Sequence, residues 1–278
     1  MDTYRAAGYP RLGAIYGFDP GVLCYEWASW ALLITGSLDQ ADAVCNEGHR
    51  IAMATDHVLT IATNLIQTAG YYSMREDAKA THSLAAQAGV YCAEHGILLR
   101  QAESEILEGW AEAELGDPAN GAPRIERGLA TWRQLGARIW DSGWYLCLAR
   151  THLLTKDVGR CRAALSEALN AAYSHGEHAY TAEVHRIEGL VHLEEGEQQE
   201  AETAFLKAVE LARRQGAKLW ELRATIALGR LWNKQGRPAA AGDMIKAIVA
   251  RFDEGHGSED LTDAKAFITE LDRAAFPD

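Results

Sequence analysis

The stretch Thr181–Gly216, TAEVHRIEGLVHLEEGEQQEAETAFLKAVELARRQG, decides the fold of this chain. In its second part, alanines and Phe205 recur at helical spacing, with charged residues between them. Gly196 supplies the permissive backbone that a tight turn needs, and Gly216 ends the second helical pattern. The stretch therefore predicts two antiparallel helices joined by a short turn.

The same pattern recurs every 40 residues along the chain. Two columns of small residues run through all the units in one register: Ser29, Ala69, Gly109, Ala149, Gly189 and Gly229, then Ala41, Thr81, Gly121, Cys161, Ala201 and Ala241. Two helices that cross closely need small side chains at their contact. Several such columns in one register indicate an internal repeat with two helices per unit.

The turn slot of the repeat holds glycine in four units, at Gly36, Gly116, Gly196 and Gly236. Glu76 and Lys156 occupy this slot in units two and four. Glutamate and lysine do not share the backbone freedom of glycine, so these two turns are predicted less clearly.

We predict an all-α fold, a superhelical α-solenoid of six helix pairs of about 40 residues each, closed by a C-terminal capping helix. The predicted first helices lie near 20–34, 59–72, 99–115, 139–154, 179–194 and 219–234. The predicted second helices lie near 38–54, 76–94, 121–135, 158–174, 199–215 and 239–253, and the capping helix spans Leu261–Ala274. The predicted domains are an N-terminal arm at 1–15, six hairpins at 16–55, 56–95, 96–135, 136–175, 176–215 and 216–255, and a capping helix with its tail at 256–278.

Composition and charge restrict the function. The chain has 278 residues, 48% of them hydrophobic and 24% charged, as in globular rather than disordered proteins. A net charge of −12 repels phosphate backbones, so we expect no direct nucleic-acid binding. No apolar run is long enough to span a bilayer, and the N-terminus lacks the apolar segment of a secretory signal. Five cysteines without a CxxC pair indicate reduced thiols, so we expect a cytoplasmic protein.

Motifs for catalysis and for metal binding are sparse. His185 and His192 share a helix face, but no cysteine joins them at ligand spacing, and His152 occupies the slot of His192 one unit earlier. Carboxylate pairs such as Glu194 and Glu195 fall on predicted solvated faces, and the HExxH and GxSxG motifs are absent. We therefore predict no enzyme activity, no metal site and no cofactor.

The repeat resembles the tetratricopeptide repeat. Unit five carries this pattern through a small residue at Gly189, the turn at Gly196, and then Ala201, Phe205 and Ala208. The period of 40 residues is longer than the usual ~34, so each helix gains residues. The resemblance implies a right-handed superhelix whose first helices line a concave groove.

Two segments carry a second resemblance: DPGVLCYEWASWALLITGSLDQA (Asp19–Ala41) and RRQGAKLWELRATIALGRLWNKQGRPAAAGDMI (Arg213–Ile245). They resemble the C-terminal repeat region of large bacterial signal-transduction regulators, which join such repeats to an ATPase and to a nucleotide-cyclase or LuxR-type output domain. The chain departs from these regulators because it holds no cyclase domain and no GxxxxGK[ST] phosphate loop. The resemblance implies a regulatory module that is either a fragment of such a protein or stands alone.

The implied groove selects candidate binding residues. Those that follow the first small column would point inward: Trp30, Gly70, Trp110, Arg150, Leu190 and Arg230. With neighbours one or two turns earlier, the candidate partner-binding residues are Glu26, Trp30, Trp110, Arg150, Arg186, Arg223 and Arg230. Tryptophan and arginine anchor interfaces, and arginine binds carboxylates with paired hydrogen bonds. We predict a protein or peptide partner, with an extended or acidic segment lying along the groove.

Three alternatives stay open at this point. The tryptophans would fill the core between repeats, and the arginines would pair with glutamates of the chain such as Glu183. A tightly wound superhelix would enclose a metabolite beside Trp110, Trp140 and Trp144, which makes the chain a small-molecule sensor. A second copy of the chain is a further alternative partner, whereas a membrane is not expected.

Overall fold

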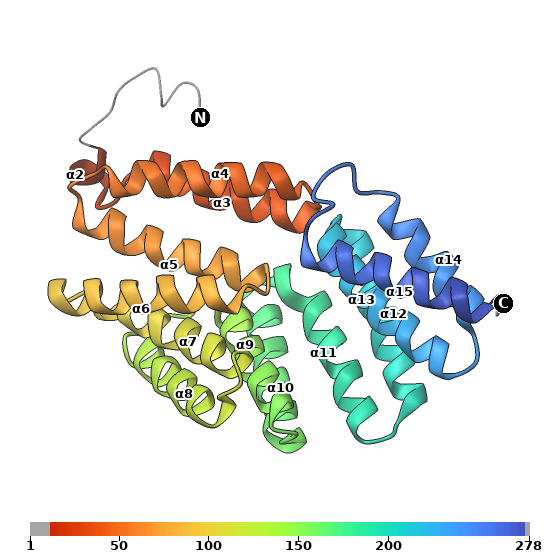
Figure 1. Cartoon of the computed structure of the whole chain (residues 1–278). Coiled ribbons are helices and arrows are strands. Elements are labelled where there is room, and N and C mark those ends of the chain that lie inside the picture. Colours follow the sequence, from red (N-terminus) through yellow and green to blue (C-terminus); the bar gives the residue numbers. More distant parts are fainter. Residues whose placement is uncertain (1–11, 276–278) are drawn as a thin grey trace.

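The computed structural model describes residues 12–275, which form helices joined by short turns and contain no strand (Figure 1). The first helices of the six pairs are α3 (Pro20–Thr35), α5 (Val58–Met74), α7 (Leu98–Glu114), α9 (Asp141–Leu154), α11 (Thr181–Glu194) and α13 (Lys218–Lys234). Their partners are α4 (Leu38–Met53), α6 (Ala78–His95), α8 (Pro118–Gln134), α10 (Val158–His175), α12 (Gln198–Gln215) and α14 (Pro238–Val249). The remaining elements are α2 (Leu12–Tyr16), the 3-10 turn η1 (His178–Tyr180) and α15 (Glu259–Ala275).

This architecture confirms the predicted all-α solenoid of helix pairs. The final helix, α15, packs against α13 and α14, where Phe267 and Leu271 are buried. It therefore covers the last pair as the predicted capping helix would. Most of the predicted N-terminal arm, residues 1–11, and the end of the tail, residues 276–278, lie outside the described part of the chain.

All six turns between the paired helices have the same backbone conformation. The glycines in the turn slot have φ between 77° and 106°, which is the left-handed region. Glu76 and Lys156 adopt it as well, with φ of 61° and 56°. The two turns that the sequence predicted less clearly are thus regular turns, made with residues that adopt this conformation at a cost.

Three of the six second helices, α6, α8 and α10, begin at an aspartate that caps them. Asp77, Asp117 and Asp157 lie 40 residues apart, and each accepts a hydrogen bond from the backbone N–H three residues later, at 2.9 to 3.3 Å. Such a cap satisfies a backbone donor that has no partner within the helix. In units two, three and four the aspartate therefore marks where the second helix starts.

The small columns are the points where paired helices touch. A Cβ atom added at Gly109 would lie 2.7 Å from the carbonyl oxygen of Gly121, and one at Gly229 would lie 2.7 Å from Cδ1 of Ile245. In unit five the ring of Phe205 packs against Gly189. Larger residues at these glycines would force the paired helices apart.

The superhelix closes on itself, because its first and last units touch. The α3 helix packs against α13, and Phe252 lies against Gly36 at the end of α3. Asp39 of α4 accepts a hydrogen bond from the backbone N–H of Gly255 at 3.1 Å. Figure 1 shows the α3–α4 pair meeting the loop between α14 and α15. The first and last units consequently both border the concave side.

The helices were also compared with the length and hydropathy that a membrane span requires. Of those between residues 12 and 275, none is both long and apolar enough to cross a bilayer.

Candidate functional site

A cavity of about 50 Å³ lies at the centre of the superhelix. All six first helices contribute residues to its wall. Trp140, which directly precedes α9, and Tyr180 of η1 also belong to the wall. The aromatic part of the wall consists of Trp30, Trp110, Trp140, Trp144, Tyr180 and Trp220. The charged part consists of Arg150, Glu183 and Arg223. A volume of this size holds about three or four water molecules or one small organic group.

The aromatic wall reaches the surface at three tryptophans from two distant units, Trp27 and Trp30 of α3 and Trp140 before α9. The ring centroid of Trp140 lies 5.3 Å from that of Trp27 and 5.2 Å from that of Trp30. Trp27 is 49% exposed, and Ile139 beside Trp140 is 56% exposed. We call Trp27, Trp30 and Trp140 the tryptophan mouth, because they join the cavity wall to an exposed apolar surface.

The backbone that carries Trp140 is strained and is held from the next unit. Trp140 has a φ of 70°, which a bulky residue adopts only at an energetic cost. The carboxylate of Glu177 accepts hydrogen bonds from the backbone N–H groups of Trp140, at 2.6 Å, and Ser142, at 3.2 Å. Glu177 therefore holds the loop in the conformation that places the Trp140 ring in the tryptophan mouth.

Glu76 is the ionic centre of the site. Its carboxylate lies 3.0 Å from Arg150, 3.4 Å from Arg223 and 3.9 Å from Arg186. Burial alone would raise the pKa of Glu76, but Arg223, Arg150 and Arg186 outweigh it and hold that pKa well below its usual range. One turn residue of unit two thus joins units four, five and six.

Each of these arginines also has a second carboxylate partner in the chain. Arg150 pairs with Glu114 at 2.8 Å, and its guanidinium lies 5.3 Å from the ring centroid of Trp110. Arg186 pairs with Glu183 at 2.7 Å.

Arg223 pairs with Asp260 at 2.6 Å, donates to the carbonyl oxygen of Met74 and lies over the ring of Trp220. Burial lowers the pKa of Arg223, but Asp260 and Glu76 raise it more, so the guanidinium stays charged. The positive charge at the centre is consequently matched by carboxylates of the chain itself.

The seven residues that the sequence selected are placed in four ways. The cavity wall holds Trp30, Trp110, Arg150 and Arg223, whereas Arg186 lies behind it in the ionic cluster. Glu26 is buried on the side of α3 that faces α5, where Asn64 donates to it at 3.0 Å. Arg230 is exposed at the end of the array and pairs with Asp263 at 2.6 Å.

Sequence reasoning missed the residues that tie the site together. Nothing in the repeat placed Glu76 at the centre, and the only available signal was that it interrupts the glycine column. Trp220 and Tyr180 share a column with Trp140, four residues after a glycine. That aromatic column was visible, but its convergence with Trp30 depends on closure of the superhelix.

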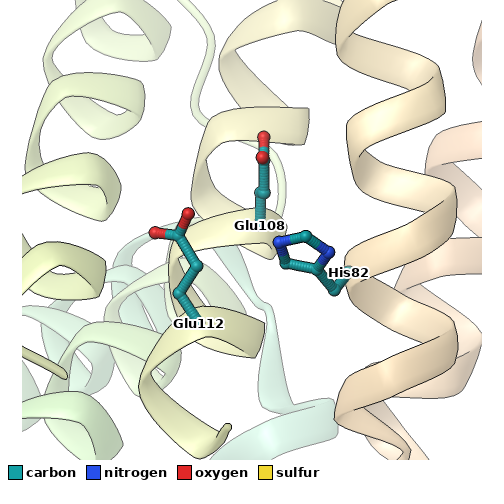
Figure 2. A group of neighbouring side chains, drawn as sticks. All are labelled: His82, Glu108 and Glu112. Atoms are coloured by element: carbon teal, nitrogen blue, oxygen red, sulfur yellow. The ribbon is translucent and has the colours of Figure 1, made fainter. Parts of the chain in front are cut away.

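A second group of side chains has the composition of a metal site. His82 on α6 and Glu108 and Glu112 on α7 place their ligand atoms within 4.8 Å of one another (Figure 2). Arg124 on α8 forms ion pairs with Glu108 at 2.8 Å and with Glu112 at 3.0 Å. Because one guanidinium already pairs with both carboxylates, a metal ion would have to displace it.

Comparisons with known proteins support the fold. No family model and no curated protein matches the chain. Among solved structures, a Rap protein complexed with Competence and Sporulation Factor matches with a TM-score of 0.62 and 12% identity, over 90% of this chain and 74% of that one. The apo form of RapI matches with a TM-score of 0.57 and 12% identity, over 91% and 71%. BtubC from P. vanneervenii matches with a TM-score of 0.51 and 15% identity, over 83% and 86%.

The fold is tetratricopeptide-like. At identities of 12 to 15%, the matches describe architecture and leave the ligand to be argued from the site.

Proposed function

We propose that this chain is a non-catalytic binding module that holds a protein or peptide partner at the tryptophan mouth of its central cavity. The observation that carries the proposal is the convergence of all six first helices on one aromatic cavity with an exposed mouth. Tryptophans are among the residues that most often anchor binding partners, and Trp27 is exposed next to the cavity. The solved Rap protein complex adds support, since that protein shares the fold and was captured with a bound factor.

The chemistry of the cavity favours binding over catalysis. Cys147 is a potential nucleophile in the wall, but burial raises the pKa of its thiol to about 12, which keeps it protonated. Glu183 is engaged by Arg186, so it is not poised as a free general base. These groups stabilise the structure and leave the aromatic surface as the part available to a ligand.

The proposal includes a regulatory setting. The resemblance of Asp19–Ala41 and Arg213–Ile245 to repeats of bacterial signal-transduction regulators supports a role as the sensing part of such a protein in the cytoplasm. A closed array that joins its first and last units is suited to this role, since a ligand at the centre would contact both ends.

The test uses peptides selected from a random library against the immobilised protein. Fluorescence anisotropy should give binding that weakens at least ~tenfold in Trp27→Ala and in Trp140→Ala, because both remove an aromatic anchor. Trp232→Ala is the matched control, since Trp232 lies outside the tryptophan mouth and its indole N–H donates a hydrogen bond to the carboxylate of Glu202. Equal affinity for all these variants would place the peptide elsewhere and overturn the proposal.

A second candidate is a small-molecule sensor. The enclosure of the cavity favours it, because about 50 Å³ has no room for a peptide backbone. A thermal-shift screen with metabolites separates the two candidates. A metabolite that raises the Tm in proportion to its concentration supports the sensor, whereas a peptide partner gives a complex of larger size.

A further inference from the structure

We propose that His82 on α6 and Glu108 and Glu112 on α7 form a binding site for one divalent transition-metal ion, with Zn²⁺ as the best fit. Figure 2 shows the three side chains gathered between the two helices, and their ligand atoms lie within 4.8 Å of one another. Glu108 and Glu112 are four residues apart and therefore share a face of α7. One imidazole and two carboxylates are ligands that Zn²⁺ accepts, with water completing its coordination.

This metal site is independent of the proposed function. The described residues that line the central cavity include none of the three ligands, so either proposal can fail without the other. The site departs from the sequence prediction of no metal site, because no motif spacing relates His82 on one helix to the two glutamates on the next.

His82 is the member of the group that the ion pairs leave unexplained. Its side chain is partly buried, but within residues 12–275 it has no hydrogen-bond or ion-pair partner. Two units later Arg162 occupies the same slot of the repeat, where it pairs with Glu195 and lies 3.3 Å from His192. A histidine in this slot gives up a permanent charge but offers a nitrogen lone pair for a metal ion, which an arginine never does.

Arg124 is the counter-ion that a metal ion would replace. Its guanidinium pairs with Glu108 at 2.8 Å and with Glu112 at 3.0 Å, so one positive charge faces two negative ones. A divalent ion would match both negative charges. The Arg124 side chain is 30% exposed, so it can turn to solvent without becoming a buried unpaired charge. Bonds of about 2.0–2.2 Å to Zn²⁺ place ligand atoms about 3.4 Å apart, so the glutamates would then turn inward toward His82.

The test is isothermal titration calorimetry of the tag-free chain, freed of metal with a chelator, at about pH 7.5, where an imidazole is mostly neutral. We expect one Zn²⁺ per chain at micromolar affinity. Mg²⁺ should bind at least ~hundredfold more weakly, because it prefers oxygen ligands and keeps its water. Zinc should also raise the Tm, since the ion would join units two and three of the folded chain. Absence of zinc binding to the wild type would overturn the proposal.

Two variants localise the ion. His82→Gln and Glu112→Gln each remove a ligand and should weaken zinc binding at least ~tenfold, a loss that even a residue supporting a ligand produces. His192→Gln is the matched control and should bind zinc as the wild type does, because His192 belongs to the other described group of this composition. Circular dichroism checks that the helices are retained, and Glu112→Gln decides should His82→Gln not fold. Wild-type affinity in the ligand variants, or loss of binding in His192→Gln alone, would place the ion elsewhere.

Arg124→Gln separates a metal site from a simple ion pair. Removal of the guanidinium frees both carboxylates, so zinc affinity should rise about fivefold, which is the strength of one partly exposed ion pair. Equal or weaker zinc affinity in Arg124→Gln would contradict the exchange between Arg124 and the ion.

Discussion

The turns at Glu76 and Lys156 occupy the same slot of units two and four and have nearly the same backbone, with φ of 61° and 56°. Their side chains have opposite environments. The Glu76 carboxylate lies among three arginines from other units. The Lys156 side chain is 74% exposed and pairs with Glu194 at the surface, at 3.0 Å.

This difference shows when a residue that interrupts the glycine column of a repeat belongs to the candidate site. A non-glycine residue in the left-handed region costs about 1–2 kcal/mol. At Lys156 a surface ion pair offsets little of this, since such pairs contribute about 0–1 kcal/mol. At Glu76 several partly buried charges interact in a medium of lower dielectric constant, so the contribution is larger. Two residues that interrupt the same glycine column therefore contribute differently to stability, and only their tertiary contacts distinguish them.

The largest expected effect comes from Glu76→Gln. It keeps the size of the side chain but leaves Arg150 and Arg223 without their shared carboxylate. We expect a loss of about 2–3 kcal/mol in the free energy of unfolding, at the low end for breaking a buried pair because 34% of the Glu76 side chain is exposed. Urea denaturation followed by circular dichroism measures it. Lys156→Gln is the matched control, and a loss there as large as in Glu76→Gln would contradict the distinction.

Glu26 extends the comparison to an interior carboxylate whose hydrogen-bond donor is the neutral amide of Asn64. Burial raises the pKa of Glu26 to about 7, against a lowering by Asn64 and Arg100. The folded pKa lies above the unfolded value of about 4.3, so the wild type loses stability as the pH rises from about 4.5 to about 7.

Glu26→Gln should remove this loss. We expect the variant to be more stable than the wild type by about 2 kcal/mol at pH 8, and no more stable near pH 4, where Glu26 is protonated. Thermal or urea unfolding at the two pH values measures the difference. The same gain at both pH values would show that ionisation of Glu26 is not its cause.

The smallest effect is expected from Lys156→Gly. Glycine removes the strain of the left-handed turn, but it loses the surface pair with Glu194 and raises the entropy of the unfolded chain. These contributions nearly cancel, so the free energy of unfolding should change by less than about 1 kcal/mol. A destabilisation comparable to that of Glu76→Gln would show that the turn slot itself, and not the inward side chain, carries the stability.

Much of the site was visible in the repeat register. The column through Trp30, Gly70, Trp110 and Arg150 was predicted to point inward, and all four residues line the cavity. The last two members of the column do not line the cavity: Leu190 packs against the core between helices, and Arg230 lies at the surface and pairs with Asp263. The register therefore predicted the inward positions of units one to four but not those of units five and six.

The sequence by itself determined the helix pairs, since a 40-residue register of small residues and turn glycines depends on contacts between neighbours in the chain. Only the tertiary structure decided that the array closes and that Trp27 meets Trp140 and Glu76 meets Arg223. Those contacts join residues more than 100 positions apart, and they depend on curvature summed over several repeats. The repeat pattern sets the rotation between neighbouring units, but it does not determine where the first and last units meet.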